Sequence, residues 1–420
     1  MLGKIKIAYR GYPSAFKVLV LASFIDMLGG FLLYPFFALY ITERFGVGMT
    51  EVGFLFAVFG AGNIFGSMVG GALADKYGRR IMIIIGLVIS GTGSIFMGLV
   101  DDLNVFYILA ASLGLVGNIG GPARQAMVAD LLPKEKQAEG FGIMRIFMNL
   151  AATVGPLLGG FLATQSYMLL FLSDAVSSFI TAVIVFIVIP ETKPENPEDK
   201  PEESVMSTIV GYIDVLKDGV FMLFLFVSAI MVMVYMQMNS TLSVFLRDVH
   251  GFPQQSFGLL LSMNALMVVL FQFWITKRIS KYAPMKVMAI GALFYVVGFG
   301  MYGFVSAVYL FFIAMIIITI GEMIVTPIQQ SSVASFAPED KRGRYMAMYG
   351  FSWGIPNLFG VLVAGLIMDY INPNLVWYIA GILSLVSVVG FWSLHGTAQR
   401  RFSKEKDSLE EERIEEMQKI

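Results

Sequence analysis

Twelve long apolar runs constrain this chain more than any other feature of its sequence. About 20 apolar residues in a helix span the hydrocarbon core of a bilayer, because each residue adds about 1.5 Å. Only 14% of the 420 residues are charged, against roughly a quarter in soluble domains. The sequence therefore predicts an all-α membrane protein with 12 transmembrane helices. The runs cover residues 15–42, 52–74, 80–100, 104–131, 139–163, 167–189, 218–246, 255–276, 285–305, 308–335, 345–369 and 374–395.

Lysine and arginine predict the orientation of these helices. If the N-terminus is cytoplasmic, all but four of the 29 basic residues fall on the cytoplasmic side. Arg44 and Arg247 fall in outer loops, and Arg124 and Arg145 lie inside predicted helices. The first run is too long for a secretory signal and lacks its small-residue cleavage site. Because basic residues collect in cytoplasmic loops, we expect a multi-pass protein of the cell membrane with both termini in the cytoplasm.

The residue types exclude several functions. There is no cysteine, and His250 and His395 both fall at predicted helix ends, so no metal site is expected. No phosphate-binding Gly-Lys-Ser/Thr loop occurs, so the chain cannot drive transport with ATP by itself. The net charge of −1 gives no sign of a nucleic-acid partner. An intramembrane enzyme would need a metal or a nucleophile with a positioned base, and it stays a remote alternative.

A polar segment divides the chain. Residues 190–204 read PETKPENPEDKPEES, a composition typical of a disordered linker. We therefore expect an N-terminal six-helix bundle over 1–189, a cytoplasmic linker over 190–217 and a C-terminal six-helix bundle over 218–395. The charged residues 396–420 would form a cytoplasmic tail.

The two halves are also related in sequence. Residues 122–162 align with 327–367 without a gap and share nine identities. Matched apolar residues arise by chance between membrane helices, whereas matched Pro, Gln and Lys rarely do. The sequence thus predicts two pseudo-symmetric bundles, a plan of transporters that hold substrate near the midplane between repeats. The polar identities pair Pro122 with Pro327, Gln125 with Gln330, Pro133 with Pro338 and Lys136 with Lys341.

The loop between the second and third predicted helices reads GALADKYGRR over residues 71–80, with one acid and three bases. Gly71 permits close approach of two helices, and Gly78 permits the turn. Asp75 can face the positive N-terminus of a neighbouring helix, and Arg79 can pair with nearby carboxylates. A positive-inside anchor would need only the bases, so the acid and the two glycines indicate a further role.

This loop resembles, at every position including Arg80, a signature of the major facilitator superfamily. The resemblance implies a cytoplasmic latch that ties the two halves together in the outward-facing state. It implies that Asp75 meets the start of the eleventh helix, and that Arg79 relays to an acid matching Asp130 at the end of the fourth. The equivalent loop of the second half, 275–287, has bases but no Asp, so we expect a one-sided latch.

Two further segments resemble proton-coupled antiporters of this superfamily. In the first helix, Asp26 and Pro35 resemble a motif of the drug:proton antiporter 1 family. In the fifth helix, Ala151 replaces one glycine of the antiporter motif, but the other positions match. The resemblance implies drug-type antiport, although small residues at helical spacing also serve ordinary helix packing. The matching positions are Gly142, Gly155, Pro156, Gly159 and Gly160.

Two acids are candidate proton carriers. Asp26 lies about eleven residues into its helix, roughly 16 Å from the start, which places it near the midplane. A carboxylate there costs roughly 2.5–3.5 kcal/mol, so it should face a cavity or a partner. Glu322 lies near the centre of the tenth helix and takes the place of Gly117 in the repeat. The alternative for both is a structural acid, hydrogen-bonded or paired with a base.

Other polar residues are candidates for the lining of a cavity. Members of the superfamily often carry an Arg earlier on the fourth helix, but that position is Ala110 here. Arg124 either substitutes for it or pairs with Asp130 or a lipid phosphate. Arg145 is expected to be an interfacial or latch-side charge. The cavity candidates are Asn118, Arg124, Asn149, Tyr235, Gln237, Asn239, Gln330 and Asn357, with Asn63, Asn264 and Gln329.

The leading functional hypothesis is a proton-coupled exporter of small hydrophobic or amphipathic compounds, similar to multidrug efflux proteins. It would work by alternating access, as a monomer in the lipid bilayer, with no cofactor beyond the coupling proton. Export or flipping of a lipid or metabolite is the alternative, as is proton-coupled uptake, because the fold does not decide the substrate.

Overall fold

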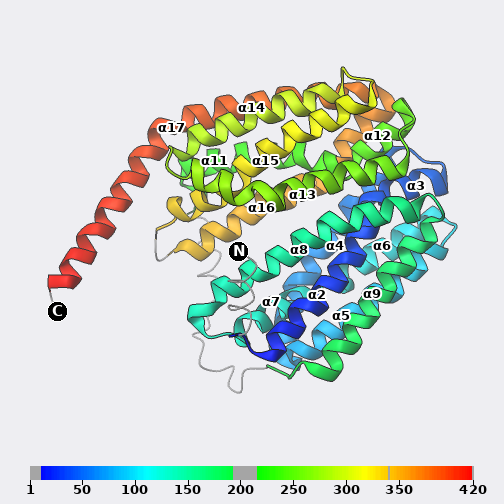
Figure 1. The fold of residues 1–420 in the computed structure, drawn as a ribbon, viewed down its shortest axis with the longest axis horizontal. Coiled ribbons are helices and arrows are strands. Elements are labelled where there is room, and N and C mark those ends of the chain that lie inside the picture. Colours follow the sequence, from blue (N-terminus) through cyan, green and yellow to red (C-terminus); the bar gives the residue numbers. More distant parts are fainter. Residues whose placement is uncertain (1–10, 193–214, 339–340, 419–420) are drawn as a thin grey trace. The chain divides into compact units, whose positions relative to one another are not determined.

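A computed structural model describes residues 11–192, 215–338 and 341–418 (Figure 1). These residues contain 12 helical spans long and apolar enough to cross a membrane, and no β-strand. The predicted all-helical class is thereby confirmed. Many large apolar side chains are exposed, among them Met68 at 71% and Ile187 at 72%. Such a surface is unfavourable in water and suits lipid.

The helices follow the predicted apolar runs closely. In the first half of the chain they are α2 (Ser14–Leu33), the 3₁₀ turn η1 (Tyr34–Phe36), α3 (Phe37–Phe45), α4 (Met49–Tyr77), α5 (Arg79–Leu99), α6 (Leu103–Gly117), α7 (Gly120–Asp130), α8 (Lys134–Ala163) and α9 (Tyr167–Val188). In the second half they are α11 (Gly219–Met236), the 3₁₀ turn η3 (Gln237–Asn239), α12 (Thr241–His250), α13 (Gln254–Ile279), α14 (Pro284–Tyr302), α15 (Val308–Phe336), α16 (Arg342–Tyr370) and α17 (Pro373–Gln418).

Three of the predicted runs are not single helices. The first is interrupted by η1, where Pro35 lacks the backbone N–H that an α-helix needs. The fourth breaks between α6 and α7 at Asn118. The run 218–246 was expected to be continuous, but it turns through η3 and an irregular Ser240 before α12 begins. At the other end of the chain α17 continues to Gln418, so residue 395 lies inside one helix.

The chain divides into two compact units. Of the described residues, unit 1 contains 11–192 together with Met238–Val269 and Val361–Asp369, and unit 2 contains the rest. Unit 1 therefore includes short segments from the second half of the sequence. The division of the chain into two six-helix bundles stays a prediction.

Unit 1 is built around close pairs of helices. Helix α2 packs on α8 and α9, α4 packs on α6, and α5 packs on α9. A Cβ at Gly29 of α2 would lie 1.9 Å from Ser177 Oγ of α9, so only glycine permits this approach. Phe16, Phe106 and Phe171 are fully buried in this unit.

Unit 2 has its own apolar core. Helix α14 packs on α15 and α17, and α11 packs on α17. The rings of Trp377, Tyr302 and Phe299 are completely buried, and Tyr302 contacts the other two edge-to-face. Tyr302 also stacks on Phe311 of α15, the helix that carries Glu322.

Candidate functional site

Asp26 forms an ion pair inside unit 1. Its Oδ2 atom lies 2.8 Å from Nη2 of Arg124, and its Oδ1 atom accepts a hydrogen bond of 3.0 Å from the hydroxyl of Ser178. The Asp26 and Arg124 side chains are each 19% exposed. Three helices meet here, because the contact at Gly29 holds α9 against α2 and the break before α7 brings Arg124 to face Asp26. Removing the charge of one partner of such a partly buried pair leaves the other without its counter-charge, which is unfavourable.

This ion pair lies on the wall of a cavity of about 600 Å³, which we call the polar cavity. Asn118 and Gln125 supply further polar groups to the wall, and Phe141 and Met144 of α8 supply apolar ones. Asp130, one of the partners considered for Arg124, pairs with Arg79 instead. Arg124 pairs with Asp26, so the structure joins two residues that sequence reasoning had treated separately.

A second cavity of about 310 Å³ adjoins the first, and we call it the aromatic cavity. Both cavities are bordered by Ser90, Gly117 and Asn118. Ala110, where the resemblance to the superfamily led us to expect an Arg, is buried and lines the aromatic cavity. The cavity is lined by Gly30, Leu33, Tyr34, Phe37, Leu55, Phe56, Phe59, Asn63, Ser90, Ser94, Met97, Ala110, Leu113, Gly117, Asn118 and Asp174.

Sequence reasoning missed Asp174. It lies in α9 and lines the aromatic cavity. The signal was present, because Asp174 is the one acidic residue between Tyr167 and Val188. An acid within a membrane span indicates a functional site.

The predicted latch residues lie at the junction of α4 and α5. Arg79 is buried and forms an ion pair with Asp130. Asp75 lies 3.8 Å from Arg79 and is 64% exposed. The expected contact between Asp75 and the start of α16 concerns residues of different units and stays a prediction.

Glu191, within the predicted linker, caps this junction. Its carboxylate accepts hydrogen bonds from the backbone N–H groups of Arg79, at 2.7 Å, and Arg80. These are the first free N–H groups of α5, where a negative charge is favourable. Gly78 makes room, since its φ is +107° and a Cβ there would lie 2.5 Å from Glu191 Oε2.

The antiporter-motif residues of α8 form a close-packed face. A Cβ at Gly155 would lie 2.5 Å from Phe31 Cβ, and one at Gly159 would lie 2.4 Å from the carbonyl of Leu32, both on α2. Gly160 approaches the start of α13, where a Cβ at Gly258 would lie 2.3 Å from the carbonyl of Pro156. Gly142 faces open space. Four of the five motif residues therefore lie where α8 packs most tightly.

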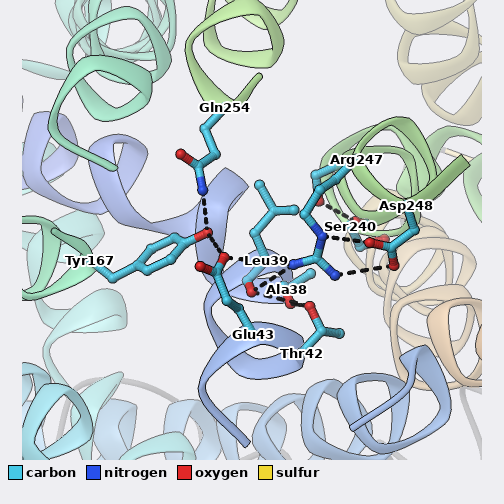
Figure 2. Close-up of polar contacts among 10 residues, drawn as sticks. Ala38, Leu39, Thr42, Glu43, Tyr167, Ser240, Arg247, Asp248 and Gln254 are labelled. Carbon is cyan, nitrogen blue, oxygen red and sulfur yellow. Dashed lines mark hydrogen bonds and ion pairs between the residues drawn. The ribbon is translucent and has the colours of Figure 1, made fainter. Parts of the chain in front are cut away.

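A polar network joins α3, α9, α12 and the start of α13 within unit 1 (Figure 2). Tyr167 donates a hydrogen bond of 2.9 Å to Glu43 and accepts one of 2.9 Å from Gln254. Arg247 reaches the same group, with Nη1 3.8 Å from Glu43 and 3.3 Å from the carbonyl of Leu39. The other side of its guanidinium binds Asp248 through two hydrogen bonds.

Asp369, near the end of α16, binds the first turn of α4. Its carboxylate accepts the N–H of Met49 at 3.0 Å, the N–H of Thr50 at 2.7 Å and the hydroxyl of Thr50 at 2.7 Å. A Cβ at Gly365 would lie 2.4 Å from the carbonyl of Met49, so the two backbones nearly touch. We call the contacts of α4 with residues 361–369 the outer seam, after the predicted orientation.

In unit 2, Glu322 accepts a hydrogen bond of 3.1 Å from Tyr235. Both residues line a small cavity of about 60 Å³ with Gln329 and Trp353. Gln237 is buried and donates hydrogen bonds to the carbonyls of Met233 and Gly360. Among the remaining cavity candidates, Gln330 is exposed and Asn149, Asn239 and Asn357 are partly buried.

Asp218 connects three helices at one end of unit 2. It accepts the N–H of Phe221 in α11 at 3.2 Å and hydrogen bonds of 2.7 Å from Tyr345 of α16 and from Arg401 of α17. Burial raises the pKa of its carboxyl, but these hydrogen bonds and the Arg401 charge outweigh burial and leave the pKa below its usual value.

Comparison with known proteins indicates a transporter. The chain matches the family model described as Major Facilitator Superfamily over residues 19–356 and 254–417. It is 26% identical to a Na(+), Li(+), K(+)/H(+) antiporter of Planococcus maritimus, over 80% of this chain and 86% of that protein. It is 23% identical to the multidrug resistance protein MdtH of Shigella flexneri, over 93% and 96% of the two chains. The fold is similar to a crystal structure of the nucleoside transporter NupG, with a TM-score of 0.80 and 14% identity over 91% of this chain and all of that one.

Proposed function

The chain belongs to the Major Facilitator Superfamily, and from that membership we propose that it is a proton-coupled antiporter that exports small apolar or amphipathic compounds. Within the superfamily we assign it to the drug:proton antiporter 1 family, on the motifs of α2 and α8. Relatives named as an antiporter and as a multidrug resistance protein support this assignment. The basic residues support a place in the cell membrane with both termini in the cytoplasm, and we expect a monomer.

The observation that carries the proposal is the Asp26–Arg124 ion pair on the wall of the polar cavity. A cavity of this size admits water, so a proton can reach the carboxylate. Protonation of Asp26 removes its negative charge and leaves the Arg124 guanidinium without its counter-charge. Breaking one side of a buried pair costs roughly 3–5 kcal/mol, and partial exposure reduces this cost. A proton thus disfavours the conformation in which Asp26 and Arg124 lie together.

Alternating access requires such a bias. A ligand shifts a conformational equilibrium only by the difference between its affinities for the two states. In the proposed cycle the proton favours the state in which Asp26 and Arg124 separate, and the exported compound favours the other state. Each then drives the other across the membrane in the opposite direction.

The test is transport by purified protein in liposomes under an imposed pH gradient, with ethidium as the exported probe. We expect accumulation of ethidium that depends on the gradient. Asp26→Asn should abolish the dependence while equilibrium exchange of ethidium continues. The matched control is Asp101→Asn, because Asp101 also pairs with an arginine, Arg44, but does so at the surface, with 77% of its side chain exposed.

A second variant guards against misfolding. If Asp26→Asn alone does not fold, Asp26→Asn combined with Arg124→Gln removes both charges and leaves no unpaired one. This double variant should also exchange ethidium without coupling. Wild-type accumulation in either variant, or accumulation without a gradient, would contradict the proposal.

Exchange of alkali cations for protons is a second candidate function. It is favoured by the relative named as a Na(+), Li(+), K(+)/H(+) antiporter. The same liposomes distinguish the two candidates, with a pH-sensitive dye in the lumen. Collapse of the gradient on addition of NaCl or KCl, with no ethidium transport, would favour alkali-cation exchange.

A further inference from the structure

The junction between α13 and α14 in unit 2 carries four basic side chains and no acid. They are Lys277 and Arg278 at the end of α13, Lys281 in the turn, and Lys286 in the first turn of α14. All four are exposed, and none of their side chains forms an ion pair or hydrogen bond with a residue in the described part of the chain. We propose that this junction, together with Trp392 of α17, binds the phosphate headgroup of an anionic phospholipid. This inference does not depend on the proposed antiport.

The junction between α4 and α5 in unit 1 balances its bases with acids. Arg79 forms an ion pair with Asp130 and lies 3.8 Å from Asp75. Glu191 accepts hydrogen bonds from the first N–H groups of α5. Three acids of the chain itself therefore offset the positive charge of that junction.

The internal repeat makes these two junctions equivalent. The offset that relates the two halves of the sequence places Lys76 and Tyr77 on Lys281 and Tyr282. In both pairs the lysine lies over the tyrosine ring, with its Nζ atom 5.3 Å from the ring centre in unit 1 and 5.1 Å in unit 2. The two junctions can therefore be compared position by position.

Unit 2 has uncharged residues where unit 1 has these acids. The positions equivalent to the three acids hold Ser280, Ser335 and Gly396. No Asp or Glu occurs anywhere in the sequence between Asp248 and Glu322. Like charges repel one another unless an opposite charge lies nearby. The negative charge that balances the α13–α14 junction therefore has to come from another segment or another molecule.

Exposed aromatic side chains indicate that this molecule is a lipid. Trp274 of α13, Tyr282 and Trp392 are 62%, 57% and 60% exposed. Such side chains are enriched at the bilayer surface, where the ring contacts acyl chains and its polar group contacts headgroups. The Nζ atom of Lys286 lies 5.9 Å from the ring centre of Trp392, on the helix that packs against α14 (Figure 1). A phosphate held at the membrane surface, with about 1 kcal/mol of attraction for each nearby base, fits both features.

The experiment measures which lipid contacts Trp392. Purified full-length protein is reconstituted in mixed vesicles of phosphatidylcholine and phosphatidylglycerol, with bromine on the acyl chains of one lipid or the other to quench tryptophan fluorescence. The difference between wild type and Trp392→Phe gives the quenching of Trp392 alone. We expect phosphatidylglycerol to be enriched beside Trp392 by roughly threefold or more over its bulk fraction. Lys281→Gln combined with Lys286→Gln should abolish the enrichment, and both side chains are exposed and unpaired among the described residues, so this variant should fold.

The repeat supplies a matched control for the lysines. Lys76→Gln removes a base that also lies over a tyrosine, but from the junction that acids already balance, and it should leave the enrichment unchanged. Lys281→Gln alone should reduce it. Equal quenching of wild-type Trp392 by the two brominated lipids, or equal loss in Lys76→Gln and Lys281→Gln, would overturn the proposal.

Two other sources of negative charge are tested in the same vesicles. Glu410, Glu411 and Glu412 belong to the acidic C-terminal segment, and changing all three to Gln in the full chain should leave the enrichment unchanged. A rise would show that this segment competes for the junction, and the lipid would not be its occupant. Loss of the enrichment on addition of sodium phosphate at constant ionic strength would identify a free anion instead and would also overturn the proposal.

Discussion

The contact of Asp369 with the first turn of α4 makes a quantitative prediction for Asp369→Asn. The carboxylate accepts three hydrogen bonds from Met49 and Thr50, and two of them come from backbone N–H groups at a helix start. The amide keeps one acceptor oxygen, but it places an NH₂ group against the other donors and removes the charge that interacts with the helix dipole. A lost cap typically costs about 1 kcal/mol and a lost charge at a helix N-terminus about 0.3–1 kcal/mol. Because Asp369 is exposed, water offsets part of the loss, and we expect about 1–2 kcal/mol in total.

This cost should appear as more frequent opening of the outer seam. At about 1.4 kcal/mol per factor of ten, the population with α4 detached from residues 361–369 should rise roughly 5- to 30-fold. The chain has no cysteine, so a single Met49→Cys reports on this site alone. Met49 is 1% exposed, and its backbone N–H is retained in the variant. The labelling rate with a membrane-impermeant maleimide then follows the opening equilibrium, as for other local openings.

The controls test the mechanism. Asp101→Asn removes another outer acid, paired with Arg44, and should leave the labelling rate at position 49 unchanged. Thr50→Val removes the hydroxyl partner, and its effect should be smaller than additive when combined with Asp369→Asn, because both variants break the same bond. An unchanged rate in Asp369→Asn, or an equal rise in Asp101→Asn, would refute this account of the seam.

Three further predictions concern stability and coupling. The pKa of Asp218 is lowered in the folded protein. Its charge therefore stabilises the fold fully above the unfolded pKa of about 3.9, and this stabilisation is lost as pH falls through the folded pKa. The difference in melting temperature between wild type and Asp218→Asn should be constant near neutral pH and vanish in acid. Gly78→Ala should lower stability by about 1–3 kcal/mol, since ψ of 151° at positive φ is a conformation almost restricted to glycine, and a melt as stable as wild type would contradict the role given to Glu191. Glu322→Gln should keep its hydrogen bond from Tyr235 and abolish gradient dependence of ethidium transport if Glu322 carries a proton; unchanged coupling would leave Asp26 as the carrier.

Much of the fold could be predicted from the sequence. The apolar runs located all 12 spans, because a bilayer of given thickness demands a helix of given length wherever it is crossed. The interruptions at Gln237–Asn239 and Asn118 were missed, since hydropathy stays high through a 3₁₀ turn or a short break. In the candidate site, Asp26, Arg124 and Glu322 were identified as acids or bases out of place in apolar helices.

The partners of those residues could not be predicted. Arg124 and Asp26 are 98 residues apart, and Asp369 and Met49 are 320 apart. Asp174 could have been noticed as the one acid in its span, but the cavity that it lines could not. Glu191 looked like part of a charged linker until its carboxylate was placed on the start of α5.

The division between what was predictable and what was not has a physical reason. A membrane helix satisfies its own backbone hydrogen bonds, so its existence and length depend on local composition alone, and the sequence by itself determined them. Whether a charged side chain is paired, and with which residue, depends on which faces of the helices pack together. Packing at contacts such as that of Gly29 with Ser177 decides those faces, and only the tertiary structure shows that Asp26 is paired with Arg124.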